Sequence, residues 1–156
     1  MPDRSERAKP MLRITKFRRD DRGATLVEYA IAATVFVTTL FAVLEFGRAL
    51  WAHNALTDAA RRGARYAVLH SSGSSSSVKN VVVYGDPAGG TQPILPDLTT
   101  GNVDVTYSAN FTVNDGTATV TITNYKFNFV LPLLPKSITM PAYSTTLTGE
   151  SAGYVP

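Results

Sequence analysis

The amino-acid sequence predicts an α+β protein in which one long N-terminal helix packs on a small antiparallel β-sheet. One apolar run and a segment rich in Ala, Leu and Arg fill the first part of the chain, whereas the later part has stretches that alternate with a period of two. A serine-rich low-complexity segment, 71–77, separates the two. We therefore expect four parts: a basic cytoplasmic leader (1–23), a transmembrane helix (24–46), an extracytoplasmic continuation of that helix (47–70) and a small antiparallel β domain (71–156).

The positive charge of the chain is concentrated in its N-terminal tail. Residues 1–22 hold eight basic and four acidic residues, whereas the remainder holds seven basic and eight acidic residues. The formal charge of +3 therefore belongs to the tail and not to a basic folded domain, and we expect no nucleic-acid partner. The chain has no cysteine, which excludes disulfides and thiolate chemistry.

Residues 24–46 have the composition of a transmembrane helix. The sixteen residues between Glu28 and Glu45 contain no charge, no Gly and no Pro, and with 24–27 they approach the length that crosses roughly 30 Å of hydrocarbon. A buried core helix is an alternative, but the sequence offers no comparable second helix to pack against it. A cleaved secretory signal is less favoured, because the run is long and no small-x-small site follows it. The basic tail predicts a cytoplasmic N-terminus, with lipid around the helix.

Helix signals continue beyond the apolar run. At 1.5 Å per residue, an unbroken helix from 24 to 69 would be about 70 Å long. Small or apolar residues recur every three or four positions and form one narrow helix face, the small-residue face. Small side chains let another backbone approach closely, and two partners fit this face equally well: neighbouring helices or the protein's own β domain. This face consists of Ala49, Ala52, Leu56, Ala59 or Ala60, Gly63 and Ala67. At the membrane exit, Glu45 and Arg48 lie one turn apart and are expected to pair.

Several strands are expected after the serine-rich segment. Residues 81–84 form a short apolar run typical of a strand, and 85–101 is a loop rich in Gly and Pro. In 103–113 every odd position is apolar or aromatic and every even one is polar, and Asp115-Gly116 has the residue types of a two-residue hairpin turn. That turn would pair Val113 with Ala118, Phe111 with Val120 and Ala109 with Ile122.

The end of the chain predicts a bend and further strands. The alternation shifts phase near Asn124, which indicates a bulge or bend there. Residues 138–147, after the LPLLP run at 131–135, predict one or two final strands. The sheet would have one apolar face, and the amphipathic helix is expected to cover it.

Residues that could carry catalysis are scattered. His53 and His70 are the two histidines, and neither has metal-ligand spacing with a partner. The Arg61, Arg62, Arg65 cluster is most simply a solvated helix face. We expect no catalytic residue, no metal and no cofactor, and therefore no enzymatic activity.

The most informative motif stands at the start of the apolar run. Basic residues precede Gly23 and Ala24, and Glu28-Tyr29 follows just inside the run. A carboxylate there is costly, although near the interface the cost falls below the roughly 3 kcal/mol expected at the membrane centre. Complementing the helix dipole is one structural explanation for Glu28. With Glu45-Phe46-Gly47-Arg48 and the segment 59–66, AARRGARY, the sequence resembles prepilins, specifically the TadE-like pseudopilins of tight-adherence (Tad, Flp-type) pilus systems.

The resemblance implies a pilin-like fold and a processing step. A prepilin peptidase would cut after Gly23, leaving Ala24 as the new N-terminus and Glu28 fifth in the mature chain; Tyr29 completes a Glu-Tyr pair similar to the Flp-type subgroup. The other implied partners are pilins or pseudopilins and an assembly platform in the bacterial inner membrane, with the C-terminal domain in the periplasm. Whether such a subunit enters a surface fibre, primes it or stays at its base is left open. So is an uncleaved, membrane-tethered binding or adhesion module acting through 85–101.

Overall fold

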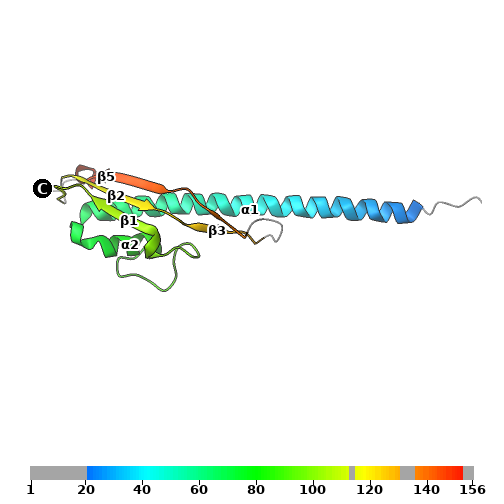
Figure 1. Ribbon diagram of the computed structural model, residues 1–156, viewed down its shortest axis with the longest axis horizontal. Coiled ribbons are helices and arrows are strands. Elements are labelled where there is room, and N and C mark those ends of the chain that lie inside the picture. The colour runs from blue at the N-terminus through cyan, green and yellow to red at the C-terminus, as the bar shows by residue number, and fades with distance from the viewer. Residues whose placement is uncertain (1–20, 113–114, 131–135, 153–156) are drawn as a thin grey trace, which may run out of the picture. The chain divides into compact units, whose positions relative to one another are not determined.

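The protein folds as one long helix followed by a small α+β region (Figure 1). The computed structural model describes residues 21–112, 115–130 and 136–152. Most of the basic leader and the LPLLP run lie outside the described residues. The helices are α1 (Asp21–Leu69) and α2 (Ser75–Tyr84), with short 3-10 turns at Ser72–Ser74, Thr100–Asn102 and Gly149–Ala152. The strands are β1 (Val103–Tyr107), β2 (Thr117–Ile122), β3 (Lys126–Asn128), β4 (Ser137–Thr139) and β5 (Tyr143–Thr148).

The chain divides into two compact units, residues 1–38 and 39–156. In the first unit, the described side chains of α1 from Gly23 onward are exposed except for the half-buried Ala33. Among the described residues, one helical stretch, Gly23–Leu69, is long and apolar enough to cross a membrane. An apolar helix that buries so little against the described part of its chain needs another apolar environment, and a bilayer supplies one.

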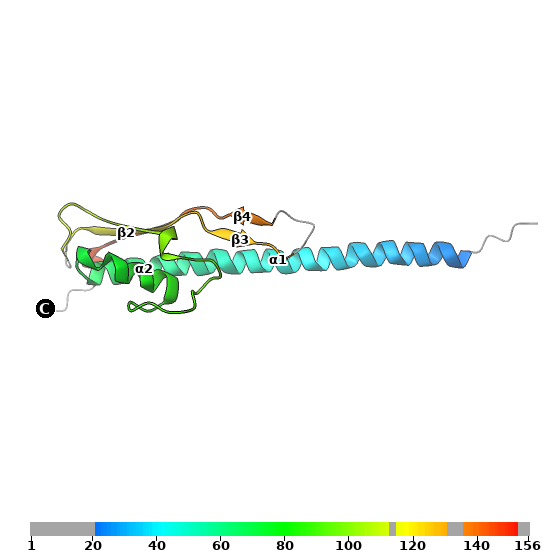
Figure 2. The same cartoon turned by 60° about the horizontal axis from the view of Figure 1, so that its bottom comes forward.

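The second unit contains two antiparallel sheets. A three-stranded sheet has the order β1-β2-β5, and β3 and β4 form a separate two-stranded sheet (Figure 2). The buried face of the larger sheet carries Val103, Ala118, Val120, Ile122 and Tyr143. The predicted fold class, a long helix packed on a small antiparallel sheet, is confirmed.

The small-residue face of α1 forms one wall of the core. Ala52, Leu56, Ala59, Ala64 and Ala67 are fully or almost fully buried, and all belong to one hydrophobic cluster with the sheet and α2. Of the two partners that the sequence left open for this face, the protein's own β domain is therefore the one it contacts. Small side chains are required there because a helix and a sheet approach closely only where little side chain separates their backbones.

The segment after α1 is helical, and the prediction of a strand at 81–84 was wrong. Serines occupy the 3-10 turn and the first turn of α2, whose valines Val78, Val81 and Val82 are buried. That spacing places the three valines on one helix face and overrides the β-propensity of valine. Gly85 ends the helix with a left-handed φ of 79°, and its N–H donates to the Val81 carbonyl at 3.0 Å.

The hairpin register predicted around Asp115-Gly116 was also wrong. Tyr107 pairs with Ala118 and Val105 with Val120, so β1 ends before Ser108. The chain then turns from Ser108 to Phe111, and an isolated bridge joins Thr112 to Asp115. The predicted and observed registers differ by an even number of residues, so both place apolar opposite apolar and the alternation could not distinguish them. Gly116 does have a positive φ, of 88°.

The bend and the final strands are confirmed. Asn124 adopts a left-handed φ of 57° between β2 and β3, where the alternation changes phase. Strands β4 and β5 fall within or next to the predicted 138–147 region.

Gly63 tests how closely α1 packs. A Cβ atom built there would collide with Val82 of α2 and lie 3.4 Å from Val120 of β2. We expect Gly63→Ala to destabilise the protein by about 1–3 kcal/mol through overpacking. Gly47→Ala is the matched control in the same helix, since nothing lies within 4 Å of its Cβ position; it should be neutral or stabilising by up to about 1 kcal/mol. Equal midpoints for the two variants in denaturant titrations of the full-length protein in detergent would contradict this packing.

Candidate functional site

The residues of the processing motif lie at the start of α1. Gly23, Ala24, Glu28 and Tyr29 are all helical and exposed, and the Tyr29 side chain is 72% exposed. Nothing approaches within 4 Å of the position that a Gly23 Cβ would take. Among the described residues, no side chain pairs with the Glu28 carboxylate. The described residues therefore leave the motif uncovered.

The second acid of the apolar run has a different environment. Glu45 is buried, with its side chain only 7% exposed. Among the described residues, it is the one charged residue that is buried. One carboxylate oxygen accepts a hydrogen bond from the Arg48 guanidinium at 2.7 Å, and the other accepts one from the backbone N–H of Val130 at 3.0 Å. Each oxygen thus has a donor, which offsets the cost of removing the carboxylate from water.

Arg48 and Glu45 together join α1 to the β3 end of the small sheet. The Arg48 guanidinium lies over the Phe127 ring, 5.3 Å from its centroid, while it pairs with Glu45. The spacing of Glu45 and Arg48 in the sequence predicts their ion pair. The sequence contains no pattern that predicts the contacts with Val130 and Phe127. A backbone N–H can belong to any residue, and the two segments are far apart in the chain.

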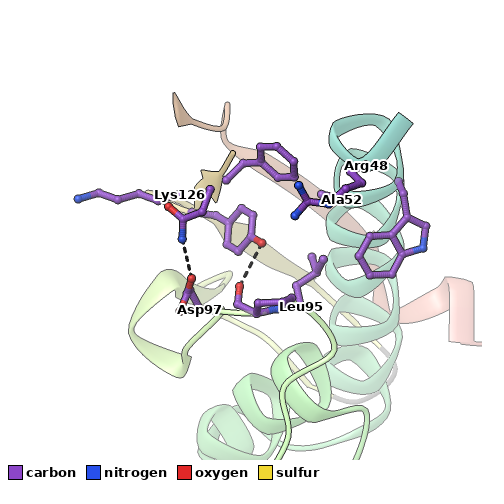
Figure 3. A pocket seen from close by; sticks show the side chains of 10 residues that line it. Arg48, Ala52, Leu95, Asp97 and Lys126 are labelled. Carbon is purple, nitrogen blue, oxygen red and sulfur yellow. Dashed lines mark hydrogen bonds between the residues drawn. The ribbon is translucent and has the colours of Figure 1, made fainter. Parts of the chain in front are cut away.

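A small cavity lies beside Arg48 (Figure 3). Its volume is about 90 Å³, below the roughly 300–1,000 Å³ of most ligand sites, and we assign it no ligand. Within its wall, Tyr125 donates to the Pro96 carbonyl at 3.1 Å, and Asn128 donates to Asp97 at 2.8 Å. Burial raises the pKa of the Tyr125 hydroxyl, the Asp97 charge raises it further, and Arg48 opposes the shift.

The two histidines have packing partners. The Nδ1 atom of His53 lies 2.9 Å from the Tyr143 hydroxyl, and the His70 ring stacks on Tyr66. Within the described ranges, no group of three or more His, Cys, Asp or Glu residues could hold a metal ion. The Arg61, Arg62 and Arg65 side chains are exposed, as a solvated helix face requires.

Glu45 should contribute measurably to folding. We expect Glu45→Ala to destabilise the protein by about 1–3 kcal/mol, because the Val130 N–H and the Arg48 guanidinium both lose their acceptor. Asp58→Ala is the control, since Asp58 pairs with Arg61 at 3.6 Å on an exposed face; its cost should be about 0–1 kcal/mol. The single tryptophan, Trp51, lines the cavity beside Arg48 and provides a fluorescence signal for denaturation in detergent. Equal effects of the two substitutions would contradict a structural role for Glu45.

Comparison with known proteins supports the resemblance carried by this helix. Residues 23–65 match the family model described as TadE-like protein. No curated protein and no solved structure matches the chain significantly. The match begins at Gly23 and includes Glu28, Glu45 and Arg48, and the apolar helix of the same segment is long enough to span a bilayer. Together they indicate a membrane-anchored component associated with Tad pilus systems. The similarity to the TadE-like family thus covers the apolar helix and its continuation, residues 23–65.

Proposed function

We propose that the protein is a minor pilin-like (pseudopilin) subunit of a Tad-type pilus or secretion apparatus. It is inserted in the bacterial inner membrane with its N-terminus in the cytoplasm and its β domain in the periplasm. A prepilin peptidase removes residues 1–23, and the helix then assembles with other pilins or pseudopilins on an inner-membrane platform. The observation that carries the proposal is the exposed apolar part of α1 within the TadE-like segment, with Gly23 and Glu28 at its start.

The exposed apolar side chains of α1 are better explained by a role in assembly than by a role in folding. Its apolar side chains between Leu26 and Leu44 contribute nothing to the core of the β domain, which is built from Ala52 onward. In a bilayer they contact lipid, and in an assembly they would contact the same surface of other helices. An uncleaved binding module would need the anchor but not the Gly23 and Glu28 motif.

Removal of the leader changes the electrostatics of the helix start. The leader has four more basic than acidic residues, and those charges hold the N-terminus in the cytoplasm. Cleavage replaces them with a single α-amino group on Ala24. In a helical assembly the Glu28 carboxylate of one subunit would neutralise the amine of a neighbour, where an unpaired charge in an apolar bundle would be expensive.

The bond to be cut lies in the first turn of α1, which must unwind for cleavage. Gly23 lowers the cost of unwinding, because glycine is about 1 kcal/mol less favourable in a helix than alanine. We expect N-terminal sequencing and intact-mass measurement of membrane-extracted protein to give a mature chain that begins at Ala24. A chain that still begins at Met1, in cells with an active prepilin peptidase, would contradict the proposal and favour the uncleaved module.

Glu28 should serve assembly rather than folding. We expect Glu28→Gln to leave membrane insertion and the denaturation midpoint unchanged, because the side chain is exposed. Breaking a buried charge pair costs about 3–5 kcal/mol, so recovery with partner pilins should fall by at least about tenfold. Surface piliation should fall as well.

The control for this experiment is another acid of the same helix. Asp58→Asn also removes one negative charge from an exposed position of α1, and it should assemble normally. Glu45→Gln is unsuitable, because that carboxylate has structural partners within the chain. If Glu28→Gln assembles normally, the proposed assembly role is wrong, and Glu28 is only an acid that the membrane interface tolerates.

A further inference from the structure

The β3–β4 sheet has exposed apolar side chains that the core does not explain. Outside α1, the exposed large hydrophobic residues of the described part of the chain are Val130, at 75%, and Ile138, at 41%. Ile138 is in β4, opposite Phe127, and Val130 follows β3 on the side where the two strands are connected. The larger sheet has no such residues on its outer face, where Thr119 and Thr121 bond to Thr146 and Ser144.

A hydrogen bond links Val130 to the turn of α1 that contains Glu45. The Val130 N–H donates to the Glu45 carboxylate, so Val130 lies within reach of the Glu45 side chain. The exposed apolar surface of α1 does not stop at that level, because Phe46, Leu50 and Trp51 are exposed too. Trp51 lies about 9 Å further along the axis than Glu45, at 1.5 Å per residue. A tryptophan at the end of an apolar segment is typical of the membrane–water interface, and Val130 would then lie no farther from the bilayer than Trp51.

The charged side chains near Val130 and Ile138 favour contact of this surface with lipid headgroups over exposure to water alone. Lys126 and Lys136, at the two ends of the small sheet, are exposed. The acids nearby have partners: Glu45 is neutralised by Arg48, and Asp97 accepts from Asn128. Long basic side chains beside apolar ones bind the phosphates of lipid headgroups while their stems stay in the apolar region.

We propose that the β3–β4 sheet docks on the bilayer surface where α1 leaves the membrane. Val130 and Ile138 enter the interface, Lys136 contacts lipid phosphate, and the Glu45 carboxylate holds Val130 at the required depth. The occupant of this surface is lipid. This inference rests on the proposed membrane span of α1, but it does not depend on leader removal or on assembly.

Single cysteines can test the proposal directly, because the chain contains none. Val130→Cys and Ile138→Cys are labelled with an environment-sensitive fluorophore in the full-length protein. Ser144→Cys, on the outer face of β5, is the matched exposed control, and Phe36→Cys reports insertion of α1. Each is reconstituted into vesicles of phosphatidylcholine, with or without phosphatidylglycerol, that carry nitroxide quenchers on the headgroup or deep in the acyl chain.

We expect headgroup nitroxides to quench labels at 130 and 138 at least roughly twofold more than the label at 144. Anionic lipid should strengthen this quenching, and Lys136→Glu should remove that increase. Glu45→Ala should lower quenching at 130 toward the value at 144. The label at 36 should be quenched by the deep nitroxide.

Three results would overturn the inference. Equal headgroup quenching at 130 and 144, with deep quenching at 36 intact, would refute docking alone and leave the anchor standing. Loss of deep quenching at 36 would refute both the membrane span and the docking. Shielding of 130 and 138 that disappears when the protein is diluted in the bilayer would assign the surface to a second copy of the chain instead of lipid.

Discussion

Close packing of the small-residue face of α1 against the sheet and α2 is the constraint on which the folded region depends. A sheet with one apolar face needs a cover, and Val120 of β2 approaches that cover at Gly63. The same helix carries, toward its N-terminus, an apolar surface that the chain leaves exposed. One element therefore has two different surroundings along its length, and its C-terminal part supplies one wall of the core of the β region.

The change of surroundings coincides with Glu45. Between Glu28 and Glu45 the helix carries no charge and its side chains are exposed apart from Ala33, whereas from Ala52 onward one face is buried and the charged residues lie on the exposed side. A carboxylate at this position must be neutralised, and Arg48 and the Val130 N–H do so from within the folded region. The ion pair thus also fixes the end of β3 against α1. Because the helix forms part of the core, a force that moves α1 along its axis is transmitted to the β domain.

Sequence reasoning found the features that repeat and missed those that depend on a single distant contact. The apolar run, the small-residue face ending near Ala67 and the bend at Asn124 all follow from periodicity or its interruption, and the structure contains them. Helix α2 was missed because a valine run reads as a strand, although Gly85 and the three- and four-residue valine spacing were available as signals. The Val130 partner of Glu45 had no signal at all, since any residue supplies a backbone N–H.

The contrast between the two acids of the apolar run bears on the proposed assembly. Both Glu28 and Glu45 carry a charge that an apolar surrounding penalises, and each therefore needs a positive or hydrogen-bonding partner. Glu45 finds its partners within the chain, and its carboxylate is shielded from neighbouring molecules. Glu28 is exposed and has no partner among the described residues. A partner from another molecule is the simplest way to satisfy it in a membrane, and the new α-amino group of a processed subunit has the required charge. The acid that the fold leaves exposed is thus the one to which the pilin-like proposal gives an intermolecular role.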